Sequence, residues 1–205
     1  MTAPDAGGTQ AGLPALLDQE LLRRRLRSHP WPAPLADDPA RRRAAVLVPI
    51  LSGPEPAILL TKRTPHLSSH AGQVAFPGGR IDPTDRSAEA AALREAEEEI
   101  GLDPALVSLL GRLPDQDTGT GFRITPIVGL LPPDPPLSPA PAEVEALLHL
   151  PFSVLLDPAA PQRRQSMLRG RLREYWVWPH PEHDIWGATA TILVRLALVL
   201  RGPDE

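Results

Sequence analysis

Four of the five consecutive residues from Glu95 to Glu99 are glutamates. In an α-helix, Glu95, Glu98 and Glu99 stand at positions i, i+3 and i+4 and therefore share one face. Like charges at these spacings destabilise a helix by a few tenths of a kcal/mol per pair. A divalent cation removes that repulsion, and Mg2+ and Mn2+ both accept carboxylate oxygens as ligands. The spacing therefore predicts that Glu95, Glu98 and Glu99 bind Mg2+ or Mn2+ as a cofactor.

The residues next to this cluster favour a site over a surface helix whose charges only increase solubility, which is the alternative reading of the acids alone. Arg94 stands four residues before Glu98 and can hold that carboxylate in place. Gly78 and Gly79 lie just upstream. Glycines give a loop the freedom to approach the helix and present backbone groups to a metal or a phosphate.

Mg2+ and Mn2+ held by a few carboxylates complete their coordination shells with water and substrate phosphates. A bound metal would neutralise such a phosphate group and lower the pKa of its water ligand. One carboxylate must then accept the proton. Glu95 and Glu98 are candidates for this role, and Glu143 and Glu145 from a later segment are alternatives.

The acidic helix is expected to run from about residue 87 to residue 100. Leu93, Ala96 and Ile100 cluster opposite the acids, which predicts that they form its buried face. Ala91 and Ala92 continue the acidic face toward the N-terminus, where their small side chains are expected to leave open space beside the carboxylates.

The other elements indicate an α/β protein, with a mixed sheet packed between helices. Residues 1–13 are rich in Gly, Ala and Pro and are expected to be disordered. Residues 14–44 combine a short helix, over 14–28, with a proline-rich connector, and residues 45–201 form the main domain. Further helices are expected over 151–157 and 185–200. Strands are expected over 44–51, 57–63, 73–76, 107–113, 123–131, 143–150 and 171–179.

Composition narrows the class of protein. The 205 residues carry a net charge of -4, which argues against a nucleic-acid or membrane-surface protein, because either would show a basic excess. The chain has no cysteine, which excludes disulfides and thiolate metal sites. The N-terminus lacks the order of a signal peptide, and the apolar run near the C-terminus is too short to span a bilayer. We therefore expect a cytoplasmic protein whose partner is a small molecule, with a homodimer left open.

The stretch from Gly79 to Leu102 resembles the Nudix box. The second half of that motif is intact from Arg94 to Leu102. The first half differs: fourteen residues separate Gly79 from Arg94 where the pattern has thirteen, and Arg86 stands at the place of the early Glu. An extra loop residue, with Asp85 or Asp82 replacing that Glu, reconciles the two patterns. The resemblance implies the Nudix fold for residues 45–201, with its box at about 79–102.

The segment "LLTKRTPHLSSHAGQVAFPGGRIDPTD" is also similar to the one that marks the coenzyme A diphosphatase branch of Nudix hydrolases, and "IWGATATIL" resembles that branch's C-terminal helix. This resemblance implies metal-dependent hydrolysis of coenzyme A, or a derivative of it, to 3',5'-ADP and 4'-phosphopantetheine. A Nudix hydrolase of another nucleoside diphosphate, such as ADP-ribose, NADH or an oxidised nucleotide, is the main alternative. A ligand-binding Nudix module without catalysis is a third, against which the intact acids argue.

The 3'-phosphate distinguishes coenzyme A from simpler nucleotides and needs cationic partners. Lys62 and Arg63 are the leading candidates, followed by His66 and His70. Lys62 is the single lysine in a chain that otherwise uses arginine as its basic residue. An exposed strand-end lysine is the alternative explanation. Since the two residues are adjacent in a predicted strand, only one of their side chains should point at the site.

Overall fold

The computed structural model describes residues 17–66, 71–168, 171–178, 180, 183 and 185–202. The segment 1–13, expected to be disordered, and the predicted substrate residue His70 lie outside these residues. None of the helices in the described residues is long and apolar enough to cross a membrane.

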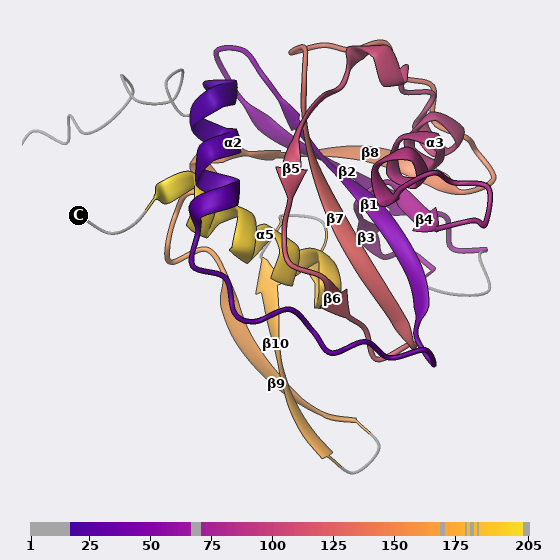
Figure 1. Ribbon diagram of the computed structural model, residues 1–205, viewed down its shortest axis with the longest axis vertical. Helices are drawn as coiled ribbons and strands as arrows, with labels where there is room; N and C mark the ends of the chain where they lie inside the picture. Colours follow the sequence, from indigo (N-terminus) through magenta and orange to yellow (C-terminus); the bar gives the residue numbers. More distant parts are fainter. Residues whose placement is uncertain are drawn as a thin grey trace, which may run out of the picture.

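A mixed sheet of eight strands forms the centre of the described part of the chain (Figure 1). Strands β3, β2, β1, β7 and β5 follow one another across it, while β4 pairs with β1, β6 with β7 and β8 with β2. β1 and β7 are parallel and the other pairs are antiparallel. The strands are β1 (Arg42–Leu51), β2 (Ala57–Arg63), β3 (Val74–Ala75), β4 (Gly78–Arg80), β5 (Ser108–Arg112), β6 (Gln116–Asp117), β7 (Phe122–Leu131) and β8 (Val144–Pro151).

Helices cover both faces of this sheet, as the sequence predicts. α3 (Ala88–Ile100) packs on one face, and α2 (Gln19–Ser28) and α5 (Gly187–Arg201) pack on the other. Short helices α4 (Phe152–Leu155) and η1 (Pro104–Leu106) lie in the connections. A second, small sheet contains β9 (Gln162–Leu168), β10 (Arg171–Trp178) and β11 (Ile185–Trp186), and its β9–β10 hairpin extends away from the main body (Figure 1).

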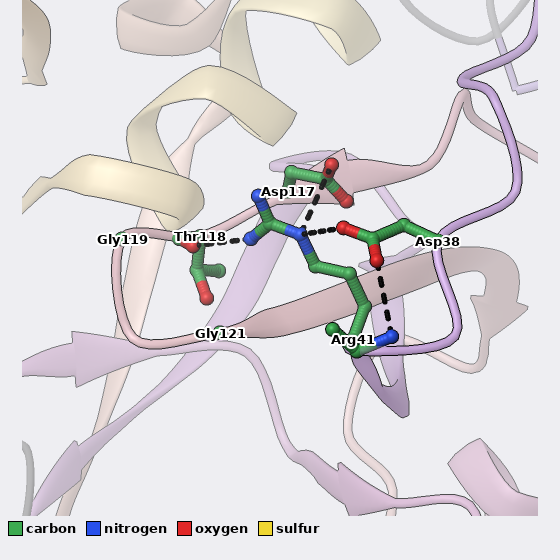
Figure 2. Close-up of a pocket in the computed structure, with 7 residues that line it drawn as sticks. Asp38, Arg41, Asp117, Thr118, Gly119 and Gly121 are labelled. Carbon is green, nitrogen blue, oxygen red and sulfur yellow. Dashed lines mark hydrogen bonds and ion pairs between the residues drawn. The ribbon is translucent and has the colours of Figure 1, made fainter.

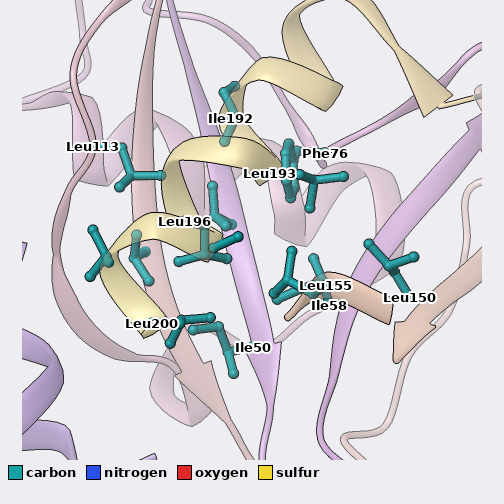
Figure 3. Close-up of a cluster of buried hydrophobic side chains, with 14 of the residues drawn as sticks. Ile50, Ile58, Phe76, Leu113, Leu150, Leu155, Ile192, Leu193, Leu196 and Leu200 are labelled. Atoms are coloured by element: carbon teal, nitrogen blue, oxygen red, sulfur yellow. The ribbon is translucent and has the colours of Figure 1, made fainter. Parts of the chain in front are cut away.

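Two apolar layers hold the helices against the sheet. Figure 3 shows the larger one, in which Leu200 of α5 lies beside Ile50 of β1 and Leu193 lies beside Phe76. The second layer lies under α3, where Ala92, Ala96 and Ile100 contact Leu47 and Ile127 and their neighbours. Because α3 meets the sheet through alanines, the helix can approach the strands closely, which brings its polar side chains near the sheet edge.

The ends of α3 are fixed by local interactions. The Ser87 hydroxyl accepts a hydrogen bond from the Ala90 amide at 3.2 Å, which caps the N-terminus. Gly101 ends the helix in the left-handed region, at φ 65°, where glycine carries no steric penalty. Its amide returns to the carbonyl groups of Ala96 and Glu97. These caps set where the helix starts and stops, and hence which way its acids point.

Several expectations differ from the structure. Ala91 and Ala92 are fully buried in the layer under α3, so they leave no open space beside the acids, and Leu93 is only half-buried. Gly78 to Arg80, whose glycines were expected in a loop, form a short strand that pairs with β1. Residues 162–168 form strand β9, which the sequence pattern did not indicate because residues 162–167 are exposed on both faces and show no apolar alternation.

Candidate active site

Glu99 is the buried member of the acid cluster. Its side chain is 4% exposed, and it accepts hydrogen bonds from the Gly78 amide at 3.0 Å and from Nη1 of Arg63 at 3.2 Å. Burial raises the pKa of Glu99 to about 7. The bonds from Gly78 and Arg63 oppose this rise, and repulsion from Glu143 and Glu95 adds to it. The folded protein therefore holds a carboxyl group that a cation would help to ionise.

Glu95 lies one turn earlier, against the backbone of β4. A Cβ atom on Gly79 would overlap the Glu95 carboxylate, so a larger residue at this position would displace that side chain. Burial raises the pKa of Glu95, while the ion pair with Arg94 lowers it and the charges of Glu98 and Glu143 raise it. The two glycines thus contact two carboxylates directly: the Gly78 amide bonds to Glu99, and Gly79 lies against Glu95.

Arg94 links the acids to the loop before the helix. Its Nη1 lies 2.9 Å from Oε1 of Glu95 and 3.2 Å from Oε2 of Glu98. Its other nitrogens bind Asp85 and the carbonyl oxygen of Arg80, the latter at 3.1 Å. Glu98 itself is mostly exposed. The Arg94 guanidinium therefore connects Glu95 and Glu98 to the loop before α3.

Asp85, and not Asp82, is the principal loop partner of Arg94. The Asp85 side chain is 6% exposed and lies 3.0 Å from Nη2 of Arg94, whereas Asp82 is 57% exposed and 3.9 Å away. The hydrogen bond from Arg94 lowers the pKa of Asp85, which keeps it ionised. The extra loop residue is accommodated by a turn in which the Asp82 amide donates to Asp85 at 2.8 Å.

Two of the predicted substrate residues separate at the end of β2. Arg63 contacts Glu99, while Nζ of Lys62 lies 2.7 Å from Oε1 of Glu145. A register shift occurs in the pairing of β2 with β8 between these two residues. His66 lies exposed in the turn that follows β2. Of Lys62, Arg63 and His66, Arg63 is therefore the residue that contacts the acid cluster.

The loop before β8 brings a further carboxylate to the site. The Ala140 amide donates to the Glu99 carbonyl at 2.8 Å, and the Thr64 amide donates to the Glu143 carbonyl at 3.0 Å. These bonds hold the loop between α3 and β2. The charge of Glu143 contributes to the raised pKa values of both Glu95 and Glu99, so its carboxylate lies near enough to repel theirs.

A divalent metal fits the chemistry of this donor set. Glu95 and Glu99 are desolvated, repel each other and Glu143, and lie beside a strand that carries no side chain at Gly79. Within the described ranges, no three acidic or histidine side chains already converge as metal ligands. Arg94 and Arg63 neutralise the carboxylates instead. A bound metal would share these carboxylates with the two arginines.

A shallow hollow of about 540 Å³ lies elsewhere, between the connector and the β6–β7 turn (Figure 2). Its charged groups satisfy one another: Nε of Arg41 lies 3.3 Å from Asp38 and 3.5 Å from Asp117, and Nη1 donates to the Thr118 carbonyl at 2.9 Å. Because its charges are paired internally, this hollow braces the start of β1 and is a weaker candidate than the acid cluster.

Comparison with known proteins gives a family match. The family model described as the NUDIX domain matches residues 41–181. Two relatives named "Uncharacterized Nudix hydrolase NudL", from Escherichia coli O7:K1 (strain IAI39 / ExPEC) and Escherichia coli (strain K12), are 46% identical over 157 residues, which cover 77% of this chain and 82% of each relative.

Solved structures give a looser match. The MutT NUDIX hydrolase from Burkholderia pseudomallei is 26% identical, with a TM-score of 0.44, over 76% of this chain and 97% of that one. The Nudix hydrolase RenU from M. Smegmatis is 24% identical, with a TM-score of 0.47, over 57% of this chain and 74% of that one. On the family match and the identity to the two relatives, the chain belongs to the Nudix hydrolase family.

Proposed function

We propose that this Nudix hydrolase cleaves the diphosphate of coenzyme A and its acyl derivatives with Mg2+ or Mn2+. The products would be 3',5'-ADP and 4'-phosphopantetheine or its acylated form. The observation that carries the hydrolytic part is the cluster of Glu95, Glu98 and Glu99 beside the bare edge at Gly79. The choice of coenzyme A rests on the resemblance of residues 59–85 to the coenzyme A diphosphatase segment.

Under this proposal, Glu95, Glu98 and Glu99 hold the metal. The bound ion would neutralise the diphosphate and lower the pKa of a water ligand. The Gly78 amide holds Glu99, and Gly79 beside it carries no side chain that would keep the phosphates away from the carboxylates. Arg94 keeps Glu95 and Glu98 in position through its ion pair with Asp85.

Glu143 is the better-placed proton acceptor among the later acids. Its charge acts on both Glu95 and Glu99, whereas Oε1 of Glu145 lies 2.7 Å from Nζ of Lys62. Glu143 is exposed, so it can receive a proton and release it to solvent. Its removal should lower turnover while leaving the binding of substrate largely intact.

The segment around the end of β2 is proposed to contact the substrate. Arg63 sits next to Glu99 and can exchange that partner for a phosphate oxygen, because arginine binds carboxylate and phosphate with the same fork geometry. Lys62, His66 and His70 remain candidates for the rest of the nucleotide, including its 3'-phosphate.

A panel of diphosphates tests this proposal. Coenzyme A, acetyl-coenzyme A, ADP-ribose, NADH and a nucleoside triphosphate are incubated with the parent protein and Mg2+, and kcat/KM is measured for each by chromatography of the products. The expected result is the largest kcat/KM for coenzyme A or its acyl ester. A larger value for ADP-ribose or NADH would assign the chain to another Nudix substrate class, and no hydrolysis at all would favour a binding module.

A further inference from the structure

Arg42, Arg80 and Phe122 form a small cationic cluster at the start of β1. The guanidinium carbon of Arg42 lies 3.9 Å from the centre of the Phe122 ring, and that of Arg80 lies 5.8 Å from it. Both arginines are exposed and the ring is half-buried. The two guanidiniums repel each other, but cation–π contact with the same ring keeps them close together.

Strand alternation explains why no neighbouring carboxylate neutralises the charge of Arg42. Arg41 and Arg43, on either side of Arg42, lie 3.5 Å and 3.8 Å from Asp117 and Asp115. Arg42 points to the other face, where it donates to the Thr120 carbonyl at 3.0 Å. In the part of the chain that the structure describes, no carboxylate pairs with Arg42 or Arg80. The cluster thus carries two uncompensated positive charges.

The cluster adjoins the acid site through a single strand. β4 pairs Gly79 with Ala45 and Arg80 with Ala44, so Gly79 faces α3 while the Arg80 side chain faces the opposite side. The Arg80 carbonyl binds Arg94, which in turn binds Glu95. Among the described strands, β4 pairs with β1 alone, and side chains of α3 cover its other edge: Glu99 accepts from the Gly78 amide and Arg94 donates to the Arg80 carbonyl. A ligand held by these α3 side chains therefore lies next to the strand that carries Arg80.

We propose that Arg42 and Arg80 form a second anion site, which binds a phosphate monoester of the substrate one sugar away from the diphosphate. This inference rests on the proposed function and identifies the ligand as a nucleotide with an additional phosphate, which for coenzyme A is the 3'-phosphate. Two guanidiniums suit a dianionic monoester, because each can donate two parallel hydrogen bonds to its oxygens.

This assignment differs from the expectation that Lys62 or Arg63 recognises the 3'-phosphate. Those two side chains are already neutralised, by Glu145 and Glu99 respectively. A phosphate would have to displace a carboxylate from either of them. At Arg42 and Arg80 it displaces only water and a backbone carbonyl.

Equilibrium binding of adenosine 3',5'-bisphosphate and of AMP, measured by calorimetry on the intact protein, tests the site without any need for turnover. The parent should bind the bisphosphate more tightly. Arg42→Ala and Arg80→Ala should each weaken the bisphosphate by about ten- to a hundredfold and leave AMP unchanged. Arg43→Ala is the matched control, because it removes the same residue type from the same strand but from the other face; it should bind both ligands as the parent does.

Kinetics give the second readout. The ratio of kcat/KM for coenzyme A to that for dephospho-coenzyme A should fall by a similar factor in Arg42→Ala and Arg80→Ala, through a slower reaction of coenzyme A alone. Should Arg42→Ala fold poorly, Arg42→Lys keeps the charge and loses the fork, and it should show a smaller fall. The inference is overturned if the parent binds both nucleotides equally, if both alanine variants discriminate as the parent does, or if Lys62→Ala alone abolishes discrimination. A parent that hydrolyses no coenzyme A yet binds the bisphosphate through Arg42 and Arg80 would refute only the proposed function.

Discussion

Arg94 in the middle of helix α3 and Asp85 in the loop before it form a two-point ion pair, with Nε 3.1 Å from Oδ1 and Nη2 3.0 Å from Oδ2. Asp85→Asn should remove the charged acceptor and lower the free energy of unfolding by about 1.5 to 3 kcal/mol. Turnover should fall as well, because Arg94 then holds Glu95 and Glu98 without an anchor. Chemical denaturation and kcat measure the two effects. Asp82→Asn is the control and should change stability by less than about 0.5 kcal/mol, since Asp82 is largely exposed.

Glu99→Gln should reduce kcat in Mg2+ by about a hundredfold or more and should not destabilise the fold. The amide keeps the size of the side chain and relieves a buried carboxylate whose pKa is raised. Glu97→Gln is the matched control, because Glu97 is exposed on the same helix and should leave kcat unchanged. Near-parent turnover of Glu99→Gln would show that Glu99 does not hold the metal.

Stability of the metal-free protein should fall as pH rises from about 4.5 to about 7. Burial raises the pKa of Glu99 from 4.5 to about 7, so the folded state holds more protons than the unfolded state in this window. The fall attributable to Glu99 is on the order of 3 kcal/mol. Urea denaturation in a chelator, across this range, should show it in the parent and a flatter curve in Glu99→Gln. Parallel curves would contradict it.

Mg2+ should counter this loss, because it binds the ionised carboxylates. Its stabilisation of the parent should therefore be larger at about pH 8 than at about pH 6. Glu89, whose pKa is lowered to about 2 chiefly by its hydrogen bond with Arg112, affects stability only below about pH 4.5 and does not confuse the comparison. Equal stabilisation by Mg2+ at both pH values would argue against binding through Glu99.

Gly79→Ala should reduce turnover by displacing Glu95, since the added Cβ would overlap the carboxylate. Its backbone lies outside the left-handed region, so the substitution carries no conformational penalty there. The expected signature is a fall in kcat together with a weaker dependence on Mg2+, while the circular dichroism spectrum is retained. Parent-like kcat and Mg2+ dependence would mean that the strand edge and Glu95 do not work together.

Much of the fold follows from local patterns. β2 occupies residues 57–63 as predicted, and α3 begins one residue after its predicted start because Ser87 is its cap. β4 was not predictable as a strand, since two glycines have low strand propensity and their pairing with β1 is a tertiary effect. β9 carries no apolar alternation because it packs against no core, so the pattern on which strand prediction relies is missing there.

The candidate site, too, could be predicted only in part from the sequence. The i, i+3 and i+4 spacing predicted that Glu95, Glu98 and Glu99 lie together with Arg94. The choice between Asp82 and Asp85 depended on how an extra loop residue is accommodated, which only the turn at Asp82 resolves. The sequence did not indicate Arg42 and Arg80 as a site. Arginine is abundant throughout the chain, and the proximity of these two residues depends on the pairing of β1 with β4 and β7.

The products that the parent forms from coenzyme A in Mg2+ test the central claim most directly. The proposed function predicts equal amounts of 3',5'-ADP and 4'-phosphopantetheine by mass spectrometry, no release of inorganic phosphate, and loss of both products when a chelator is added. Intact coenzyme A after prolonged incubation, or dephospho-coenzyme A with free phosphate, would contradict it.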